Sequence, residues 1–156
     1  PHSELLQQFN NQYLTVRQCG TGIGSASAVK MAYAGITKGT SALHTAMLLA
    51  AERLGIADEL HRELQESQAA TYTRMENMTS ALPAVSDRYV GEMLEIAKTM
   101  ASCDMPSDFH QGAADLYRIL NASQFACERR DTVDTTRTLR QTVEICARTG
   151  LSDVKK

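Results

Sequence analysis

The sequence lacks acidic residues over most of its first third. No aspartate or glutamate occurs between Glu4 and Glu52, although Arg17, Lys30 and Lys38 all fall in that interval. The carboxylates are concentrated in the remainder, and the 156-residue chain has a formal net charge of −2. This balance excludes a generally basic nucleic-acid-binding protein. The local excess of positive charge predicts that the first third faces an anionic ligand or an acidic neighbouring surface.

The chain also has no tryptophan, only 5% aromatic residues, and no apolar run approaching the roughly 20 residues of a membrane helix. The core must therefore be built from aliphatic side chains and the seven methionines. The cysteines form no CxxC pair and have no metal-ligand spacing, so we expect no metal site; they are Cys19, Cys103, Cys127 and Cys146. We interpret them as reduced thiols of a cytoplasmic protein without a signal peptide or a membrane anchor, and disulfides are the less favoured alternative.

Helical patterns dominate and predict an all-α, multi-helix domain built around one long N-terminal helix. That helix is expected over residues 25–54, with Ser25 as its N-cap and Gly55 closing it. Residues 1–11 favour a short helix or turn, and residues 13–19 favour one short strand. Four further helices are expected over 58–70 (with a continuation to Pro83 left open), from Ser86 to 103, from Pro106 or Ser107 to 126, and over 131–148.

The long helix carries two stripes at helical spacing. The first is apolar and is expected to face the core; it comprises Val29, Ile36, Leu43, Met47, Ala50 and Leu54. The second is small and polar and leaves room for a ligand or another backbone; it comprises Ser27, Lys30, Ala34, Thr37, Ser41 and then His44 or Thr45. Gly35 and Gly39 each cost about 1 kcal/mol relative to alanine in a helix, which indicates that another element approaches closely.

The segment VRQCGTGIGSA has the strand, glycine-rich turn and helix order of a dinucleotide-binding fingerprint. That motif needs a third glycine at the right spacing, a βαβ unit of about 30 residues, and a carboxylate near 20 residues further on. Here the third glycine is displaced to Gly24, the following helix is too long, and no acid appears before Glu52. We therefore interpret the segment as a flexible turn that leads into a helix.

Lys30 stands in the second turn of the long helix, where the helix dipole disfavours a cation. Its neighbours at i±3 and i±4 are Ala26, Ser27, Tyr33 and Ala34, none of which is a carboxylate. One interpretation is a surface lysine whose stem covers apolar surface while its amine reaches water. The other is a proton-transfer group, because an unpaired, desolvated lysine has a lowered pKa.

The segments GSASAVKMAYAGITKG, ALHTAMLLAAERLGIADEL and RYVGEMLEIAKTM resemble the C-terminal helical domain of the β-hydroxyacid dehydrogenases. That superfamily includes 6-phosphogluconate and 3-hydroxyisobutyrate dehydrogenases. The resemblance is stronger to a branch whose C-terminal domain is described as 6-phosphogluconate dehydrogenase-like and of unknown function. It extends from about residue 16 to residue 120. It implies an NAD- or NADP-dependent dehydrogenase, likewise cytoplasmic, that oxidises a small anionic hydroxy acid.

In the superfamily, a lysine of this helix exchanges a proton with the substrate hydroxyl, so the resemblance implies that Lys30 is the catalytic acid/base. A glycine that precedes this lysine matches Gly24. The superfamily asparagine four residues later is replaced by Ala34, and a later lysine near the nicotinamide falls at Glu92. We therefore expect the substrate contacts to come from Gly24, from the hydroxyl of Tyr33, and from Ser27 and Thr37 on the small polar stripe.

The resemblance further implies that residues 1–24 are the tail of, or the connection from, a preceding Rossmann domain that binds most of the cofactor. Residues 25–156 would form the helical substrate and dimerisation domain of a homodimer, and the chain alone would be inactive. The alternative is a non-catalytic helical oligomerisation or interaction module, with Gly35 and Gly39 at a contact with a symmetry mate.

The remaining polar candidates favour structural roles. We expect His44 to be a half-buried structural residue and His110 to lie in a solvated first turn. Lys38 is expected to be a surface or anion-steering charge, and the segment ERRDTVD is expected to be a solvated loop.

Overall fold

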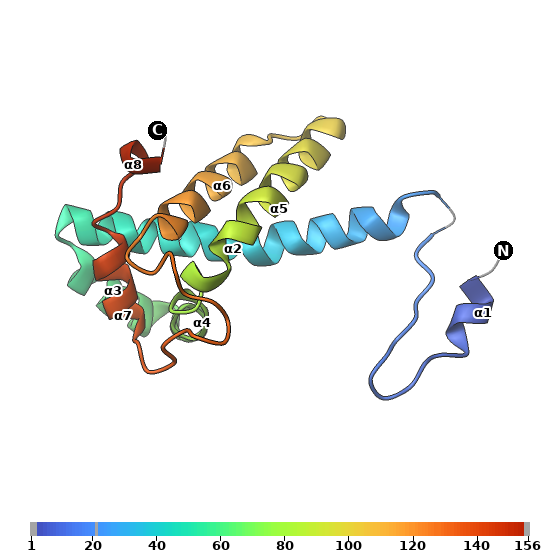
Figure 1. Ribbon diagram of the computed structural model, residues 1–156, viewed down its shortest axis with the longest axis horizontal. Coiled ribbons are helices and arrows are strands. Elements are labelled where there is room, and N and C mark those ends of the chain that lie inside the picture. Colours follow the sequence, from blue (N-terminus) through green and yellow to red (C-terminus); the bar gives the residue numbers. More distant parts are fainter. Residues whose placement is uncertain (1–2, 21, 155–156) are drawn as a thin grey trace.

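Eight α-helices and no β-strand occur in residues 3–20 and 22–154, which are the residues that the computed structural model describes. This confirms the all-α prediction (Figure 1). The expected strand over 13–19 is wrong: no second strand pairs with this segment in the described ranges, and residues 14–20 have no regular structure. The helices are α1 (Ser3–Gln7), α2 (Ser25–Leu54), α3 (Ala57–Ser67), α4 (Ala69–Thr79), α5 (Pro83–Ser102), α6 (Asp108–Asn121), α7 (Leu139–Cys146) and α8 (Leu151–Val154).

Helix α2 has the bounds that the sequence predicts, and its 30 residues span about 45 Å at 1.5 Å per residue. The cap is Gly24, with φ of 91°, and not Ser25, whose hydroxyl instead donates to the carbonyl of Gly22 (2.9 Å). Gly55 ends the helix with φ of 71°, in the left-handed region that favours glycine. In the last turn, Arg53 Nε donates to the carbonyl of Ala147 (2.9 Å).

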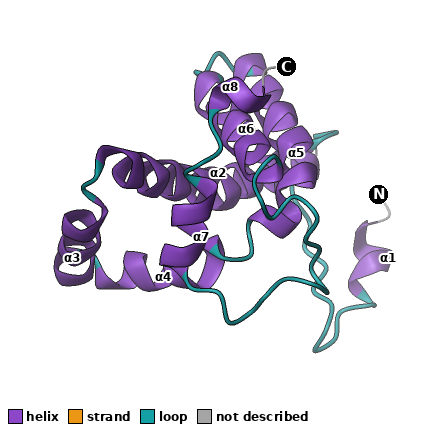
Figure 2. Cartoon of the chain, turned by 60° about the vertical axis from the view of Figure 1, so that its left-hand side comes forward, coloured by secondary structure: helices purple, strands orange, loops and turns teal. Residues whose placement is uncertain are grey.

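Helices α3 to α8 gather around the C-terminal part of α2, while its N-terminal turns project from the body and α1 lies beyond them (Figure 1). Helices α5 and α6 form an antiparallel pair that crosses α2, and α7 lies beside α4 after a long loop (Figure 2). The most deeply buried large side chains come from α2, α5, α6 and α7; they are Leu48, Met93, Tyr117, Leu120 and Val143.

The two stripes on α2 exist, but the expected core stripe is wrong. Its large side chains are exposed, Ile36 by 70% and Leu54 by 71%, and the buried face carries mainly small residues instead. Residues at or next to the small polar stripe make up that face; they are Gly35, Ser41, Ala42, Thr45, Leu48, Leu49 and Ala51. The buried hydroxyls remain satisfied, because Thr45 donates to the carbonyl of Ser41 (2.8 Å) and Ser41 to that of Thr37 (3.0 Å). Small side chains with satisfied hydroxyls allow α5 and α6 to pack close to α2.

Several boundaries differ from the predictions. The region after α2 divides into α3 and α4 at Gln68, and α5 begins at Pro83 and not after Ser86. Ser86 is buried in the first turn of α5 and donates to the carbonyl of Pro83 (2.7 Å), so it is not an N-cap. The helix expected over 131–148 is reduced to α7, because residues 122–138 form a loop that ends in a capping box at Thr138.

None of the described helices combines the length and the apolar character needed to span a bilayer. The four cysteines are free thiols, and Cys146 is buried. Burial raises the pKa of the Cys146 thiol.

Candidate functional site

Lys30 lines a pocket of about 470 Å³ between α2 and α5. On α2, Lys30, Ala34 and Lys38 follow each other at intervals of four residues and therefore share one face of the helix. The facing residues of α5 include Arg88, Gly91, Glu92, Glu95 and Ile96. The pocket thus combines three cationic side chains and two carboxylates with the uncharged residues Met31, Ala34, Gly91 and Ile96.

The side chain of Lys30 is exposed, and no carboxylate among the described residues forms an ion pair with it. The exposed side chain is not in the desolvated environment that the sequence suggested.

Lys38 is not the surface charge that the sequence suggested. Its ammonium forms an ion pair with Glu92 and lies 4.5 Å from the centre of the Tyr89 ring, and its side chain is 22% exposed. The Lys38 carbonyl accepts a hydrogen bond from Tyr117 (2.8 Å), whose pKa is raised by burial and then by Tyr89. Burial, followed by the positive charges of Arg88 and Lys30, lowers the pKa of Lys38, while the Glu92 carboxylate keeps its ammonium form paired. Lys38 therefore joins α2 to α5.

Arg88 is the functional candidate that sequence reasoning missed. Its side chain is 56% exposed; its Nε lies 3.5 Å from Glu92 Oε1, and its guanidinium carbon lies 5.1 Å from the centre of the Tyr89 ring. The spacing of Arg88 and Glu92 at i and i+4 was visible in the sequence. The sequence did not show that this face of α5 meets the lysine-bearing face of α2.

The four predicted substrate-binding residues do not line the pocket with Lys30. Gly24 and Ser27 lie at the exposed start of α2, and Tyr33 is 71% exposed next to the apolar stripe. The hydroxyl of Thr37 donates to the carbonyl of Tyr33 (2.9 Å). Their role in substrate binding stays a prediction.

His110 is not solvated, contrary to expectation. It is half-buried against α2, its Nε2 lies 3.4 Å from the carbonyl oxygen of Gly35, and its Nδ1 is buried without a hydrogen-bond partner in the described chain. The close approach predicted at Gly35 and Gly39 is confirmed, and the approaching element is α6 of the same chain. Both glycines also line an open pocket of about 520 Å³ between α2 and α6.

His44 is half-buried, as expected of a structural histidine, and its pKa is lowered by burial and then by the charge of Arg74. In the described ranges, no group of three or more His, Cys, Asp or Glu side chains is placed to hold a metal ion.

The described residues do not form a dinucleotide cradle. The glycine-rich segment is not preceded by a strand, and the hydroxyl of Ser25 occupies the space beside Gly20 and Gly22. Thr21 lies outside the described residues. The described residues of this segment therefore do not fit the pyrophosphate of NAD or NADP.

Residues 51–120 match the family model described as Domain of unknown function (DUF1932). The matched segment runs from the end of α2 into α6 and contains Arg88 and Glu92, but it begins after Lys30 and Lys38. No curated protein and no solved structure gave a significant match. The match covers less than half of the chain, and it is compatible with a C-terminal domain that accompanies a dehydrogenase.

Proposed function

We propose that this chain is the C-terminal catalytic and substrate-binding domain of an NAD- or NADP-dependent dehydrogenase that oxidises a small hydroxy acid. Lys30 is the general acid/base. The observation that carries the proposal is the position of Lys30 on a pocket with two further cationic side chains, without a carboxylate partner among the described residues. An unpaired amine in a positively charged pocket suits the hydroxyl of an anionic substrate.

In the direction of oxidation, the neutral amine of Lys30 accepts the proton of the substrate hydroxyl. A nicotinamide cofactor, bound mainly by a preceding Rossmann domain, would supply the hydride acceptor. Because Lys30 is exposed here, the second domain also has to cover the pocket, exclude water and thereby favour the neutral amine. The chain on its own has no oxidoreductase activity under this proposal.

The test is the Lys30→Ala variant of the full-length enzyme. We expect turnover to fall by about 10²- to 10⁴-fold, while cofactor binding and thermal unfolding stay unchanged. Lys30→Arg should be as inactive, because an arginine keeps the charge but does not release its proton near neutral pH. Arg62→Ala is the control, since Arg62 is an exposed basic residue of α3 that does not line the pocket. A near-normal rate for Lys30→Ala would refute the catalytic role.

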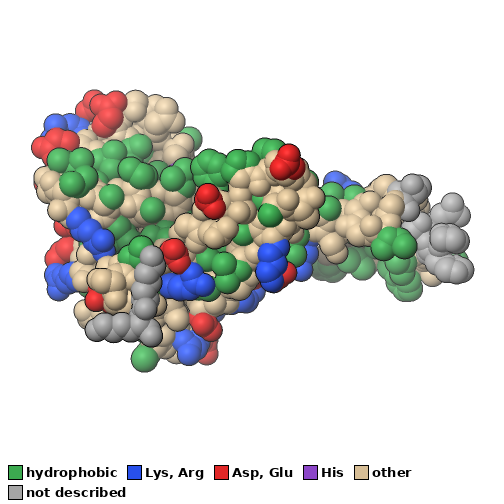
Figure 3. Space-filling view, turned by 90° about the horizontal axis from the view of Figure 1, so that it is seen from above, with side chains coloured by type: hydrophobic (Ala, Val, Ile, Leu, Met, Phe, Trp, Pro, Cys, Tyr) green, Lys and Arg blue, Asp and Glu red, His purple; other side chains and the backbone are tan. Residues whose placement is uncertain are grey.

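A second candidate function is a helical oligomerisation module that forms a homodimer. The exposed side chains of the apolar stripe of α2 favour it, together with the neighbouring Tyr33; these stripe residues are Val29, Ile36, Leu43, Met47 and Leu54. Hydrophobic side chains reach the surface both on the globular body and on the projecting arm (Figure 3). Burying one such side chain contributes about 1.5–3 kcal/mol, so a contact along the stripe would be substantial. The two functions are compatible, because Lys30 and the stripe occupy different faces of α2.

A further inference from the structure

We propose that Arg88 binds the carboxylate of the substrate, and that Glu92 controls its affinity by competing for the same cationic groups. This inference rests on the proposed function and names the group that would hold the acid end of the substrate. Arg88 lies in α5 and Lys30 in α2, and both line the same pocket of about 470 Å³.

The ion pairs of the pocket leave two cations for a ligand. Lys38 is paired with Glu92, and Glu95 is paired with Lys98 outside this pocket. Arg88 contacts an acid only through Nε, at 3.5 Å from Glu92 Oε1, and Lys30 has no acidic partner among the described residues. The free positive charge of the pocket is therefore carried by Lys30 and Arg88.

The arrangement of Arg88 suits a carboxylate. With Nε directed to Glu92, no ion pair in the described chain uses its two terminal NH₂ groups. These groups form a planar fork that binds both oxygens of a carboxylate, and the guanidinium stays charged at any physiological pH. The neighbouring Tyr89 ring, 5.1 Å from the guanidinium carbon, supports the side chain from one side.

The uncharged part of the pocket can accommodate the carbon chain of a small molecule. It is lined by Met31, Ala34, Gly91 and Ile96, none of which has a charged side chain, and Ala34 and Gly91 are small. A short hydroxy acid can therefore place its carboxylate at Arg88 and its hydroxyl toward Lys30. The two functional groups of the substrate would be held by different helices, so the packing of α2 against α5 sets the length of chain that fits.

Glu92 competes with a substrate carboxylate for the cations of the pocket. Its own carboxylate forms ion pairs with both Lys38 and Arg88. Replacing it by the neutral Glu92→Gln removes one negative charge from the pocket and leaves both cations to an incoming anion. This variant should bind a carboxylate more tightly than the wild-type chain does.

The experiment is a titration of the 156-residue chain with 3-hydroxybutyrate, followed through backbone amide chemical shifts in NMR. The matched neutral probe is butane-1,3-diol, which differs only in having an alcohol where the acid has its carboxylate. We expect 3-hydroxybutyrate to shift the amides of Ala34, Gly91 and Glu92, and the diol to leave them unchanged. Absence of these shifts with 3-hydroxybutyrate, or equal shifts with the diol, would overturn the proposal.

Four variants test the assignment to individual residues. Arg88→Gln should weaken binding by about tenfold to a hundredfold, the range for a lost charged hydrogen-bond pair. Arg62→Gln, at an exposed arginine of α3, should bind as the wild type does. Glu92→Gln should bind more tightly, and weaker binding would overturn its role as competitor. Circular dichroism of each variant checks that it is folded, and Arg88→Lys, which keeps the charge without the fork, should bind with intermediate affinity.

These binding measurements need neither cofactor nor turnover, so their outcome does not depend on whether the proposed function is correct. Unchanged binding by Arg88→Gln, combined with an inactive Lys30→Ala enzyme, refutes only the role of Arg88. Weakened binding by Arg88→Gln, combined with an active Lys30→Ala enzyme, refutes only the catalytic role of Lys30.

Discussion

The imidazole of His110 occupies the space above Gly35, with its Nε2 3.1 Å from the position that a Cβ on residue 35 would take. The methyl group Cγ2 of Ile96 lies 3.3 Å from the same position. A side chain on residue 35 would therefore meet α5 and α6 together. This contact explains why a glycine stands at position 35 of a helix, where the sequence alone showed only its unfavourable helix propensity.

We predict that Gly35→Ala lowers the free energy of unfolding by about 1–2 kcal/mol, because overpacking between three helices outweighs the gain in helix propensity. Gly112→Ala is the control, since a Cβ at this helical glycine meets nothing within 4 Å. It should raise the same free energy by up to about 1 kcal/mol. Urea unfolding of both variants checks the prediction, and a stabilised Gly35→Ala would contradict the contact.

The apolar stripe of α2 leads to a second prediction. If it forms a dimer contact, Ile36→Glu should shift the chain from dimer to monomer in sedimentation equilibrium, because a charge would be buried in an apolar contact. The unfolding of the monomer itself should change little, since Ile36 is exposed within one chain. Met105→Glu, at an exposed methionine between α5 and α6, is the matched control and should leave association unchanged. A wild-type chain that stays monomeric at all accessible concentrations would rule out the module.

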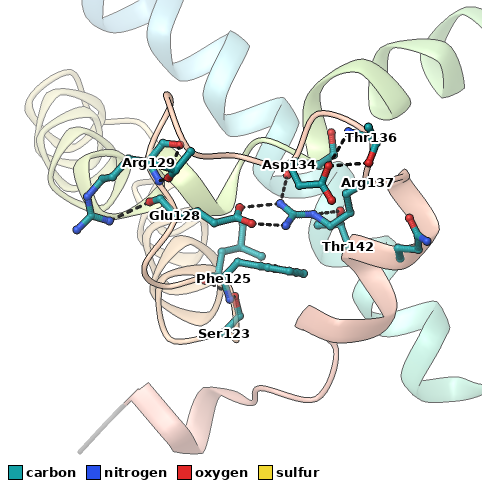
Figure 4. A network of polar contacts seen from close by, with 12 residues as sticks. Ser123, Phe125, Glu128, Arg129, Asp134, Thr136, Arg137 and Thr142 are labelled. Carbon is teal, nitrogen blue, oxygen red and sulfur yellow. Dashed lines mark hydrogen bonds and ion pairs between the residues drawn. The ribbon is translucent and has the colours of Figure 1, made fainter.

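The loop before α7 is held by Arg137, which is only 7% exposed (Figure 4). Its guanidinium forms two contacts with Glu128, donates to the carbonyl of Ser80 (2.7 Å), and lies 3.7 Å from the centre of the Phe125 ring. Glu128 belongs to the segment expected to be a solvated loop, yet its side chain is 18% exposed, so that expectation is wrong for this residue.

We predict that Arg137→Ala lowers the free energy of unfolding by about 3 kcal/mol, because it leaves the largely buried Glu128 carboxylate unpaired. Arg148→Ala breaks an exposed pair with Glu144 and should cost less than about 1 kcal/mol. Chemical unfolding of the two variants compares them directly. Equal effects would mean that the buried pair contributes no more than a surface pair.

The buried His61 predicts a pH dependence of stability. It is 3% exposed, its Nδ1 lies 2.9 Å from the Tyr72 hydroxyl oxygen, and its pKa is lowered from 6.5 chiefly by burial and then by Arg140. The unfolded chain therefore binds the proton more readily than the folded one. The stabilising contribution is complete above the ordinary histidine pKa and is lost as the pH falls toward the lowered value. His61→Gln should flatten the loss of stability between about pH 7 and pH 5, and an unchanged slope would assign the dependence to other groups.

Local signals in the sequence predicted the class of fold and the principal helix, and for a physical reason. Gly24 and Gly55 flank α2 and interrupt helical geometry, so the bounds of this helix depend on residues next to them in the chain. The loop that replaces most of the helix expected over 131–148 depends on Arg137 reaching Ser80, 57 positions away in the sequence. A partner so distant leaves no local pattern.

The prediction assigned the wrong face of α2 to the core for a related reason. Both stripes have helical periodicity, and the more hydrophobic one was assigned to the core by its composition. The structure buries Ser41 and Thr45 because their hydroxyls bond to carbonyls one turn earlier, which removes most of the cost of burying them. The same limit applies to the site. Lys30 could be identified from its unusual neighbours in the sequence, but identifying Arg88 required the relative placement of α2 and α5.

The packing of α2 against its neighbours also sets the position of Lys30. Lys30 stands five residues before Gly35, where His110 of α6 and Ile96 of α5 contact the helix, which corresponds to a lever arm of about 7 Å. A tilt of about 15° around that contact displaces this part of α2 by about 2 Å, on the scale of a hydrogen bond. Substitutions in the bundle can therefore displace the amine without contacting it. For such variants, the position of α2 should be determined as well as their stability.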